Sequence, residues 1–83
     1  KSPKGKEGIV MNTWELVTTT ATGENKYYYF MCWSAIRNPQ QAVNYGYAPD
    51  GIRLEIAEND ETPIKVTLLS PWKYFVKKFM KRC

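Results

Sequence analysis

The segment at residues 26–36, KYYYFMCWSAI, constrains the fold of this chain more than any other part of the sequence. Its two alternating sets of side chains are both apolar or aromatic: Tyr27, Tyr29, Met31 and Trp33 in one, and Tyr28, Phe30 and Cys32 in the other. Successive side chains of a strand point to opposite faces of the sheet. A strand that is apolar on both faces is typical of the centre of a sheet covered on both sides. We therefore expect a central strand here.

Another strand is expected just before it, at residues 9–20. The sequence there, IVMNTWELVTTT, is rich in β-branched and aromatic residues, which are common in strands. Residues 21–25, ATGEN, lie between the two segments. Gly23 and Asn25 tolerate positive φ angles, so this stretch suits a turn. The two strands are therefore predicted to form a hairpin.

A second hairpin is predicted from residues 52–57 and 64–69. Apolar and polar side chains alternate in both segments, as they do in half-buried strands. The inward set is Ile52, Leu54, Ile56, Ile64, Val66 and Leu68. Residues 58–63 between the segments are acidic and end at a proline, which suits a hairpin loop.

The last segment changes from strand to helix periodicity. Ser70 is a good N-cap and Pro71 fits the first helical position. Apolar side chains then recur every three or four residues, which predicts an amphipathic helix that packs on the sheet. Its apolar face contains Trp72, Phe75, Val76, Phe79, Met80 and Cys83, and its basic face contains Lys73, Lys77, Lys78, Lys81 and Arg82.

These elements predict an α+β fold: a small antiparallel sheet of two β-hairpins with a C-terminal amphipathic helix. An all-β sandwich with a short terminal helix is the alternative that the strand composition leaves open. A chain of 83 residues holds one small domain. We assign residues 9–83 to that domain and residues 1–8 to a flexible basic tail.

The chain has two cysteines, Cys32 and Cys83. On the predicted fold, Cys83 falls near the centre of the apolar helix face, and Cys32 lies on the buried strand. We therefore predict a disulfide between them, which contributes about 4 kcal/mol on the chain-entropy model. Such a bridge indicates a secreted or extracytoplasmic protein, whereas two reduced thiols would fit a cytosolic one.

Residues for catalysis and metal binding are sparse. The sequence contains no histidine, which removes the commonest general base and the commonest metal ligand. It also lacks a phosphate-binding glycine loop and a Cys-x-x-Cys motif. Two carboxylate groups occur, Glu55 with Glu58 and Asp60 with Glu61, but nothing in the sequence desolvates them. We predict that the chain is not an enzyme and that it binds no cofactor or metal.

Residues 38–51 are a candidate contact loop, because Asn38-Pro39 opens the segment and Pro49-Asp50-Gly51 closes it. Its middle could hold a short helical turn or an irregular edge strand. The composition, rigid aromatic rings with adaptable amides, is common in protein-binding loops. The candidate contact residues are Gln40, Gln41, Asn44, Tyr45 and Tyr47.

The net charge of +4 is unevenly distributed. Residues 1–8 carry +2 and residues 71–83 carry +5, whereas residues 9–70 carry −3. A basic end can attract nucleic acid, an anionic membrane or an acidic protein. It can equally be the solvated face of a terminal helix.

Together these features predict a small, secreted, non-catalytic protein-binding module of the inhibitor, immunity or host-interaction (effector) type. It would act through the 38–51 loop and the basic face of the C-terminal helix, on a protein partner that the sequence does not name. The alternative is a binder of nucleic acid or of an anionic membrane surface through the lysine-rich helix. No segment approaches the length of a transmembrane helix.

Overall fold

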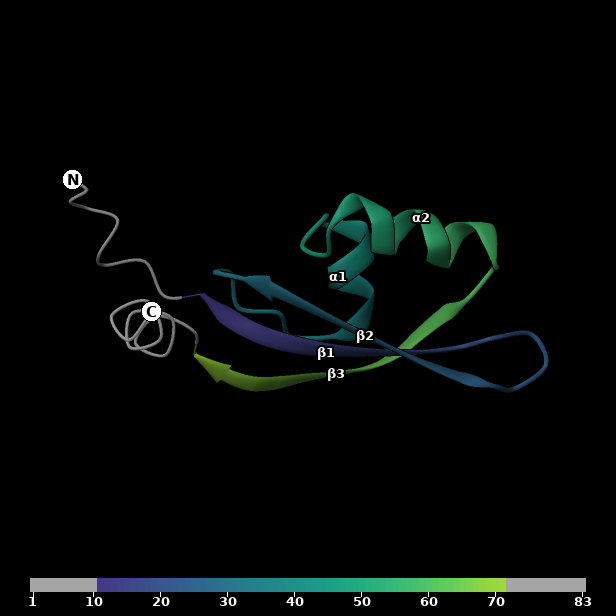
Figure 1. The fold of residues 1–83 in the computed structure, drawn as a ribbon, viewed down its shortest axis with the longest axis horizontal. Helices are drawn as coiled ribbons and strands as arrows, with labels where there is room; N and C mark the ends of the chain where they lie inside the picture. Colours follow the sequence, from purple (N-terminus) through teal and green to yellow (C-terminus); the bar gives the residue numbers. More distant parts are fainter. Residues whose placement is uncertain (1–10, 72–83) are drawn as a thin grey trace, which may run out of the picture.

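The computed structural model describes residues 11–71, which form a three-stranded antiparallel sheet and two short helices. In chain order the elements are β1 (Asn12–Thr19), β2 (Asn25–Cys32), α1 (Pro39–Asn44), α2 (Asp50–Glu58) and β3 (Thr62–Pro71). The strand order is β2-β1-β3, so β1 is central. Both helices lie over one face of the sheet (Figure 1). This arrangement confirms the predicted α+β class.

The hairpin of β1 and β2 is formed as predicted. Its register runs without interruption from Asn12↔Cys32 to Thr19↔Asn25. In the turn, the Gly23 amide donates to the Thr20 carbonyl at 2.9 Å, and the Thr20 amide donates to the Glu24 carbonyl at 2.8 Å. Gly23 has a φ of 89°, which other residues rarely adopt. The glycine therefore allows the three-residue turn.

The prediction that residues 26–36 form a central strand is wrong, because β2 lies at an edge of the sheet. One side-chain set, Tyr28, Phe30 and Cys32, is buried beneath the helices, and the other set, Tyr27, Tyr29 and Met31, is exposed. The central position belongs to β1, in which Leu16, Val17 and Thr18 are all nearly inaccessible to solvent.

The first strand of the predicted second hairpin is also wrong, because residues 52–57 lie within α2. Ile56 is buried and Ile52 packs against the core, while Leu54 is exposed. Positions i and i+4 share one face of a helix, so the same isoleucines satisfy a helical pattern as well as an alternating one. Pro49 occupies the N-cap and Asp50 the first turn, where an acidic side chain favours helix formation.

The predicted strand at residues 64–69 is confirmed within β3, but its partner is β1. Val66 packs against the core, whereas Ile64 and Leu68 are about half exposed. The register between β1 and β3 shifts at two points. One shift leaves Ile64 without a register partner in β1, which explains its exposure, and the other lies directly after the pair of Trp14 and Leu68. Ser70 and Pro71, predicted to begin a helix, end β3 instead. The rest of the predicted helix and the tail at residues 1–8 lie outside the described residues.

The core fills the space between the sheet and the two helices. Trp14, Leu16, Tyr28, Phe30 and Cys32 come from the sheet, and Ile36, Ala42, Ala48 and Ile56 come from the connecting segment and helices. The alanines allow the helices to approach the aromatic layer closely. The opposite face of the sheet carries no helix within residues 11–71.

Candidate functional site

The segment predicted as a contact loop forms α1, a tight connection and the start of α2. Asn38 caps α1 by accepting a hydrogen bond from the Gln41 amide at 3.2 Å, and Pro39 occupies the first turn. Ala42 anchors the helix because it is fully buried. The sequence interpretation allowed a short helical turn here, and the cap and proline account for where it begins.

Backbone hydrogen bonds hold the connection between α1 and α2. The Tyr45 amide donates to the Gln41 carbonyl at 3.0 Å, and the Ala48 amide donates to the Ala42 carbonyl at 2.9 Å. Gly46 has a φ of 76°, so the chain reverses there at a position that favours glycine. The connection is therefore a fixed support for the side chains that it carries.

Two tyrosines project from this support. Their rings make a T-shaped contact, with the centroids of Tyr45 and Tyr47 5.7 Å apart and an angle of 75° between the planes. Tyr47 is half-buried and packs on the core, while Tyr45 is 65% exposed. The half-buried ring of Tyr47 thus orients the exposed ring of Tyr45.

A cleft lies at the junction of the helices, next to the connection, because the Arg53 guanidinium that lines it approaches Gly46. It has a volume of about 360 Å³ and is lined by Val43, Asp50, Arg53 and Leu54. Leu54 is 61% exposed. The Arg53 guanidinium donates to the Ala48 carbonyl at 2.8 Å and pairs with Asp50, so its position is fixed. The junction surface, which we define as Tyr45, Leu54 and this cleft, combines exposed apolar groups with an oriented ion pair.

The predicted contact residues fall into two groups. Gln40 donates from its amide to the Pro63 carbonyl at 3.2 Å, and Gln41 accepts from the Arg37 amide at 2.8 Å. Both side chains therefore have structural partners within the chain. Asn44 and Tyr45 are exposed and directly follow Val43, which lines the cleft. The predicted contacts Lys73, Lys77, Lys78, Lys81 and Arg82 lie outside the described residues.

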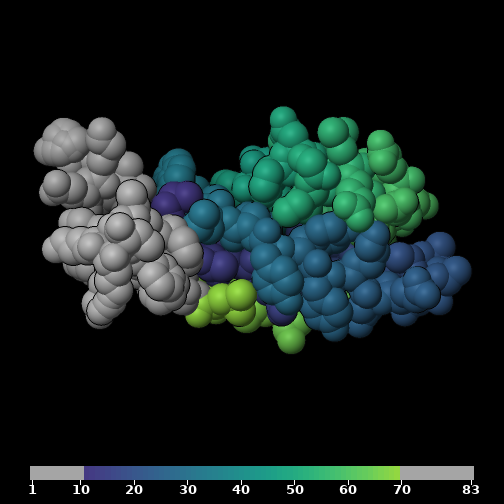
Figure 2. Space-filling model, in the orientation of Figure 1, coloured from purple at the N-terminus to yellow at the C-terminus, as the bar shows by residue number. Residues whose placement is uncertain are grey.

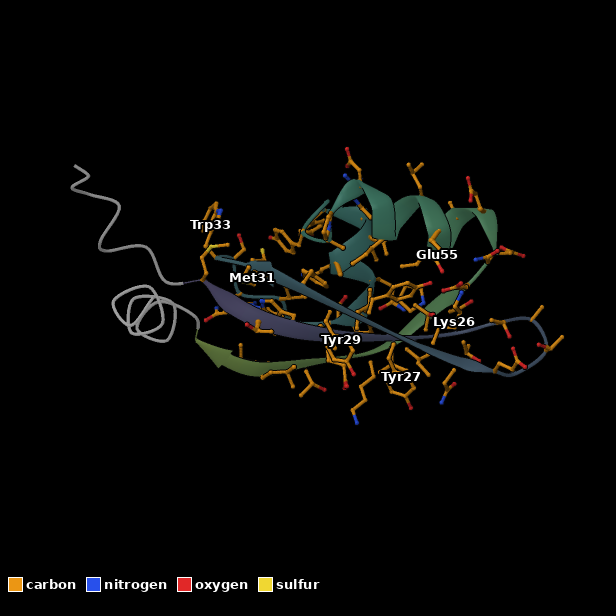
Figure 3. The ribbon with its side chains drawn as sticks, in the orientation of Figure 1. Lys26, Tyr27, Tyr29, Met31, Trp33 and Glu55 are labelled. Atoms are coloured by element: carbon orange, nitrogen blue, oxygen red, sulfur yellow. The ribbon has the colours of Figure 1, made fainter. Side chains whose placement is uncertain are left out.

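An exposed row of aromatic and methionine side chains, which the sequence interpretation favoured as packed, follows the edge strand β2, and we call it the exposed β2 row. It consists of Tyr27 (55% exposed), Tyr29 (57%) and Met31 (45%), with Trp33 (69%) just beyond the strand. Figure 3 shows both tyrosines pointing away from the helices. Tyr29 donates its hydroxyl to Glu15 at 3.0 Å, across the open face of the sheet. The signal for this exposure in the sequence is the tyrosine hydroxyl, which favours a face of the strand that contacts solvent over a face that is covered by other elements.

On the helix side of β2, the carboxylate of Glu61 lies in the interior and has four partners. Its Oε1 accepts hydrogen bonds from the hydroxyls of Thr18 and Tyr28, each at 2.7 Å. Its Oε2 accepts from the Asn59 amide at 3.2 Å and lies 3.3 Å from the Lys26 ammonium. Burial by itself would raise the pKa of Glu61, but these hydrogen bonds outweigh it and lower the pKa. The buried negative charge of Glu61 is therefore compensated by hydrogen bonds and by the Lys26 ammonium.

Lys26 connects this carboxylate to α2. Its ammonium lies 2.8 Å from the carboxylate of Glu55, and hydrogen bonds to Glu55 and then Glu61 raise its pKa. Burial, followed by the hydrogen bond to Glu61, raises the pKa of Tyr28 to about 12. Every charged or donor group of this network has a partner within it, and the cleft is lined by other residues. We therefore assign the network a structural role, joining the sheet to the end of α2.

The predicted disulfide lies partly outside the described residues. The Cys32 sulfur is buried, accepts a hydrogen bond from the Ser34 amide at 3.4 Å and forms no disulfide within residues 11–71. Its predicted partner, Cys83, is not among them. The bridge therefore stays a prediction.

Within residues 11–71, neither the net charge nor the arrangement of potential metal ligands indicates a functional site. Residues 11–71 contain four lysines and arginines against seven aspartates and glutamates, a net charge of −3. They hold no cluster of side chains suited to a metal ion, and none of their helices is long and apolar enough to cross a membrane. Comparisons with protein-family models, curated proteins and solved structures found no match to this chain. The functional argument therefore starts from the surfaces themselves.

Proposed function

We propose that the chain is a small, non-catalytic protein-binding module and that its partner contacts the junction surface. The observation that carries the proposal is the exposed Tyr45 ring, held by Tyr47 and by a hydrogen-bonded connection beside the cleft. Tyrosine and arginine are enriched among residues that dominate binding energies. Here both are already oriented, so less side-chain freedom is lost when a partner binds.

The cleft would accept a protruding apolar side chain of the partner. Val43 and Leu54 supply apolar walls, and Leu54 also extends onto the surface. Arg53 and Asp50 neutralise each other at the same site. Such a pair favours recognition of polar groups at the rim of an interface rather than proton transfer. An extracytoplasmic location and a role as an inhibitor, immunity or host-interaction protein are part of the proposal, and they depend on the Cys32–Cys83 bridge.

Site-specific photocrosslinking tests the proposal. A photoreactive phenylalanine analogue replaces Tyr45 in one variant and Leu54 in a second, and it replaces the exposed Thr22 of the β1–β2 turn in the control. Extracts and culture fluid of the source organism are then irradiated with each variant. We expect the same protein to be crosslinked from positions 45 and 54 and not from position 22. Its affinity, measured with the purified protein, should fall about tenfold or more in Tyr45→Ala.

Two results would contradict the proposal. One is equal crosslinking from all three positions, which would indicate nonspecific contact. The other is unchanged affinity in Tyr45→Ala, which would exclude the junction surface as the contact. Gln40→Ala is not a suitable binding control, because Gln40 holds α1 against β3.

A further inference from the structure

We propose that two copies of this chain associate through the outer edges of their β2 strands and form a continuous antiparallel sheet from the six described strands. The contact would be isologous, with a two-fold axis perpendicular to the sheet. It uses main-chain groups of residues 25–33 and the exposed β2 row. The inference is independent of the junction surface, which lies on the helices.

The turn establishes which main-chain groups of β2 point away from β1. The Thr20 amide bonds the Glu24 carbonyl, so these two residues are a hydrogen-bonded pair. Hydrogen-bonded and non-hydrogen-bonded pairs alternate along an antiparallel ladder. In the unbroken β1–β2 register, Tyr28 and Phe30 therefore bond β1. The amides and carbonyls of Tyr27, Tyr29 and Met31 point outward, away from β1.

The two edges of the sheet differ in how well they resist pairing. β3 contains Pro63, Pro71 and Lys65, and its pairing with β1 has two register shifts. Prolines, lysines and irregular strands are features that protect sheet edges. β2 has eight residues, no proline and no register shift. Its edge is therefore the one suited to adding a strand.

Figure 2 shows this edge uncovered in the described part of the chain. The blue atoms of β2 form the near surface between the helices above and β3 below. The side chains that would flank an added strand on the open face are Tyr27, Tyr29 and Met31, each about half exposed. Pairing would bury part of this apolar area as well as completing the main-chain hydrogen bonds.

Charge favours a second copy as the occupant. The charged side chain of β2 is Lys26, which points to the helix side and is neutralised by Glu55 and Glu61 (Figure 3). Antiparallel pairing of β2 with itself thus brings no uncompensated like charges together. A charged partner strand would form no ion pair with this edge. An identical strand keeps the ion pairs of its own Lys26 and needs none across the contact.

Self-pairing also gives a consistent register. With Tyr29 opposite Tyr29 of the second copy, Tyr27 lies beside Met31 of the second copy, and residues 25–33 overlap completely. Aromatic pairs across strands and aromatic–sulfur contacts are both favourable. Stable dimers bury about 1,200–2,000 Å² in total. One strand from each copy makes a smaller contact, so we expect a weak dimer that forms reversibly with concentration.

Analytical ultracentrifugation of the full chain over a wide concentration range tests the proposal. Tyr29→Pro removes an outward amide and obstructs an incoming strand, while leaving the bonds to β1 intact. Leu68→Pro is the matched control, because Leu68 is similarly exposed and its amide points to the outer edge of β3. We expect a concentration-dependent dimer whose dissociation constant rises about tenfold or more in Tyr29→Pro. The dissociation constant of Leu68→Pro should stay close to that of the wild type.

Amide hydrogen exchange gives a readout on the wild-type chain, in case a variant fails to fold. The amides of Tyr27, Tyr29 and Met31 should exchange rapidly in dilute protein and become protected as its concentration rises. Those of Tyr28 and Phe30 should be protected throughout. A monomer at all concentrations overturns the proposal. So do equal losses of dimer in both proline variants, and so does protection of the outward amides in dilute protein, which would mean that another segment of the same chain occupies the edge.

Discussion

At the scale of single residues, Glu61 shows how a carboxylate becomes part of a core. Its side chain is fully enclosed, and the energetic cost of burying the charge is offset by the two hydroxyls, the amide and the ammonium around it. These donors come from β1, β2 and the end of α2. The sequence placed Glu61 in an exposed acidic loop, because a carboxylate gives no sign of burial until its partners are known.

Replacing Glu61 by glutamine should therefore be costly. Glu61→Gln keeps the shape of the side chain but removes the negative charge that pairs with Lys26. It also replaces one acceptor oxygen with an NH₂ group, which faces hydrogen-bond donors and has no acceptor. We expect the free energy of unfolding at pH 7 to fall by about 2–4 kcal/mol, as measured by urea denaturation. Glu58→Gln, at an exposed position at the end of α2, is the control and should change the free energy of unfolding by less than about 0.5 kcal/mol. Equal effects of the two substitutions would exclude the structural role of the network.

The same variant should lose part of the acid sensitivity of the fold. The pKa of Glu61 is lower in the folded chain than its ordinary value of 4.5. Its contribution to stability is thus present above pH 4.5 and is lost as the pH falls through the folded pKa. For Tyr28, whose pKa is raised from 10.0 to about 12, stability is lost as the pH rises through that interval. The urea concentration at the midpoint of unfolding of the wild type should fall at both low and high pH. In Glu61→Gln its decrease at low pH should be smaller.

At the scale of elements, the sequence predicted which segments form strands better than it predicted which strands lie next to each other. The β1–β2 hairpin followed from composition and from Gly23, because these signals are local. The assignment of α2 failed because Ile52 and Ile56 fit both a strand and a helix, and a segment this short cannot decide between them. The edge position of β2 and the pairing of β3 with β1 depend on contacts between distant residues. No local pattern encodes those contacts, and the junction surface depends on them as well.

Two glycines provide a test of the element assignments. Gly51 lies in the first turn of α2, has no unusual φ, and a Cβ there would meet nothing within 4 Å. Gly51→Ala should therefore raise the free energy of unfolding by about 0.5–1 kcal/mol, since alanine is the better helix former. Gly23→Ala, also with free space but with a φ of +89°, should lower it by about 1 kcal/mol or more. Destabilisation by Gly51→Ala would contradict the helix and return residues 52–57 to a strand.

At the scale of the whole molecule, the sheet brings two distant parts of the chain to the same end. Cys32, at the end of β2, and Pro71, at the end of β3, are both register partners of Asn12. Neighbouring strands lie about 4.8 Å apart, so the two ends are separated by about 10 Å across the sheet. Residues 72–83 continue from Pro71, and an extended chain covers about 3.3 Å per residue. The twelve residues after Pro71 are therefore long enough to span the distance between the two strand ends.

The predicted bridge can be measured directly. If it forms, the oxidised monomer should be lighter than the reduced one by two hydrogens, and unfolding without a reductant should expose no free thiol. Reduction should lower the free energy of unfolding by about 4 kcal/mol, because a loop that encloses β3 and both helices is released. Cys83→Ser should match the reduced wild type in stability and leave one thiol that reacts slowly until the chain unfolds, since Cys32 is buried. Two thiols in the unfolded, unreduced wild type would remove the bridge and, with it, the support for an extracytoplasmic location.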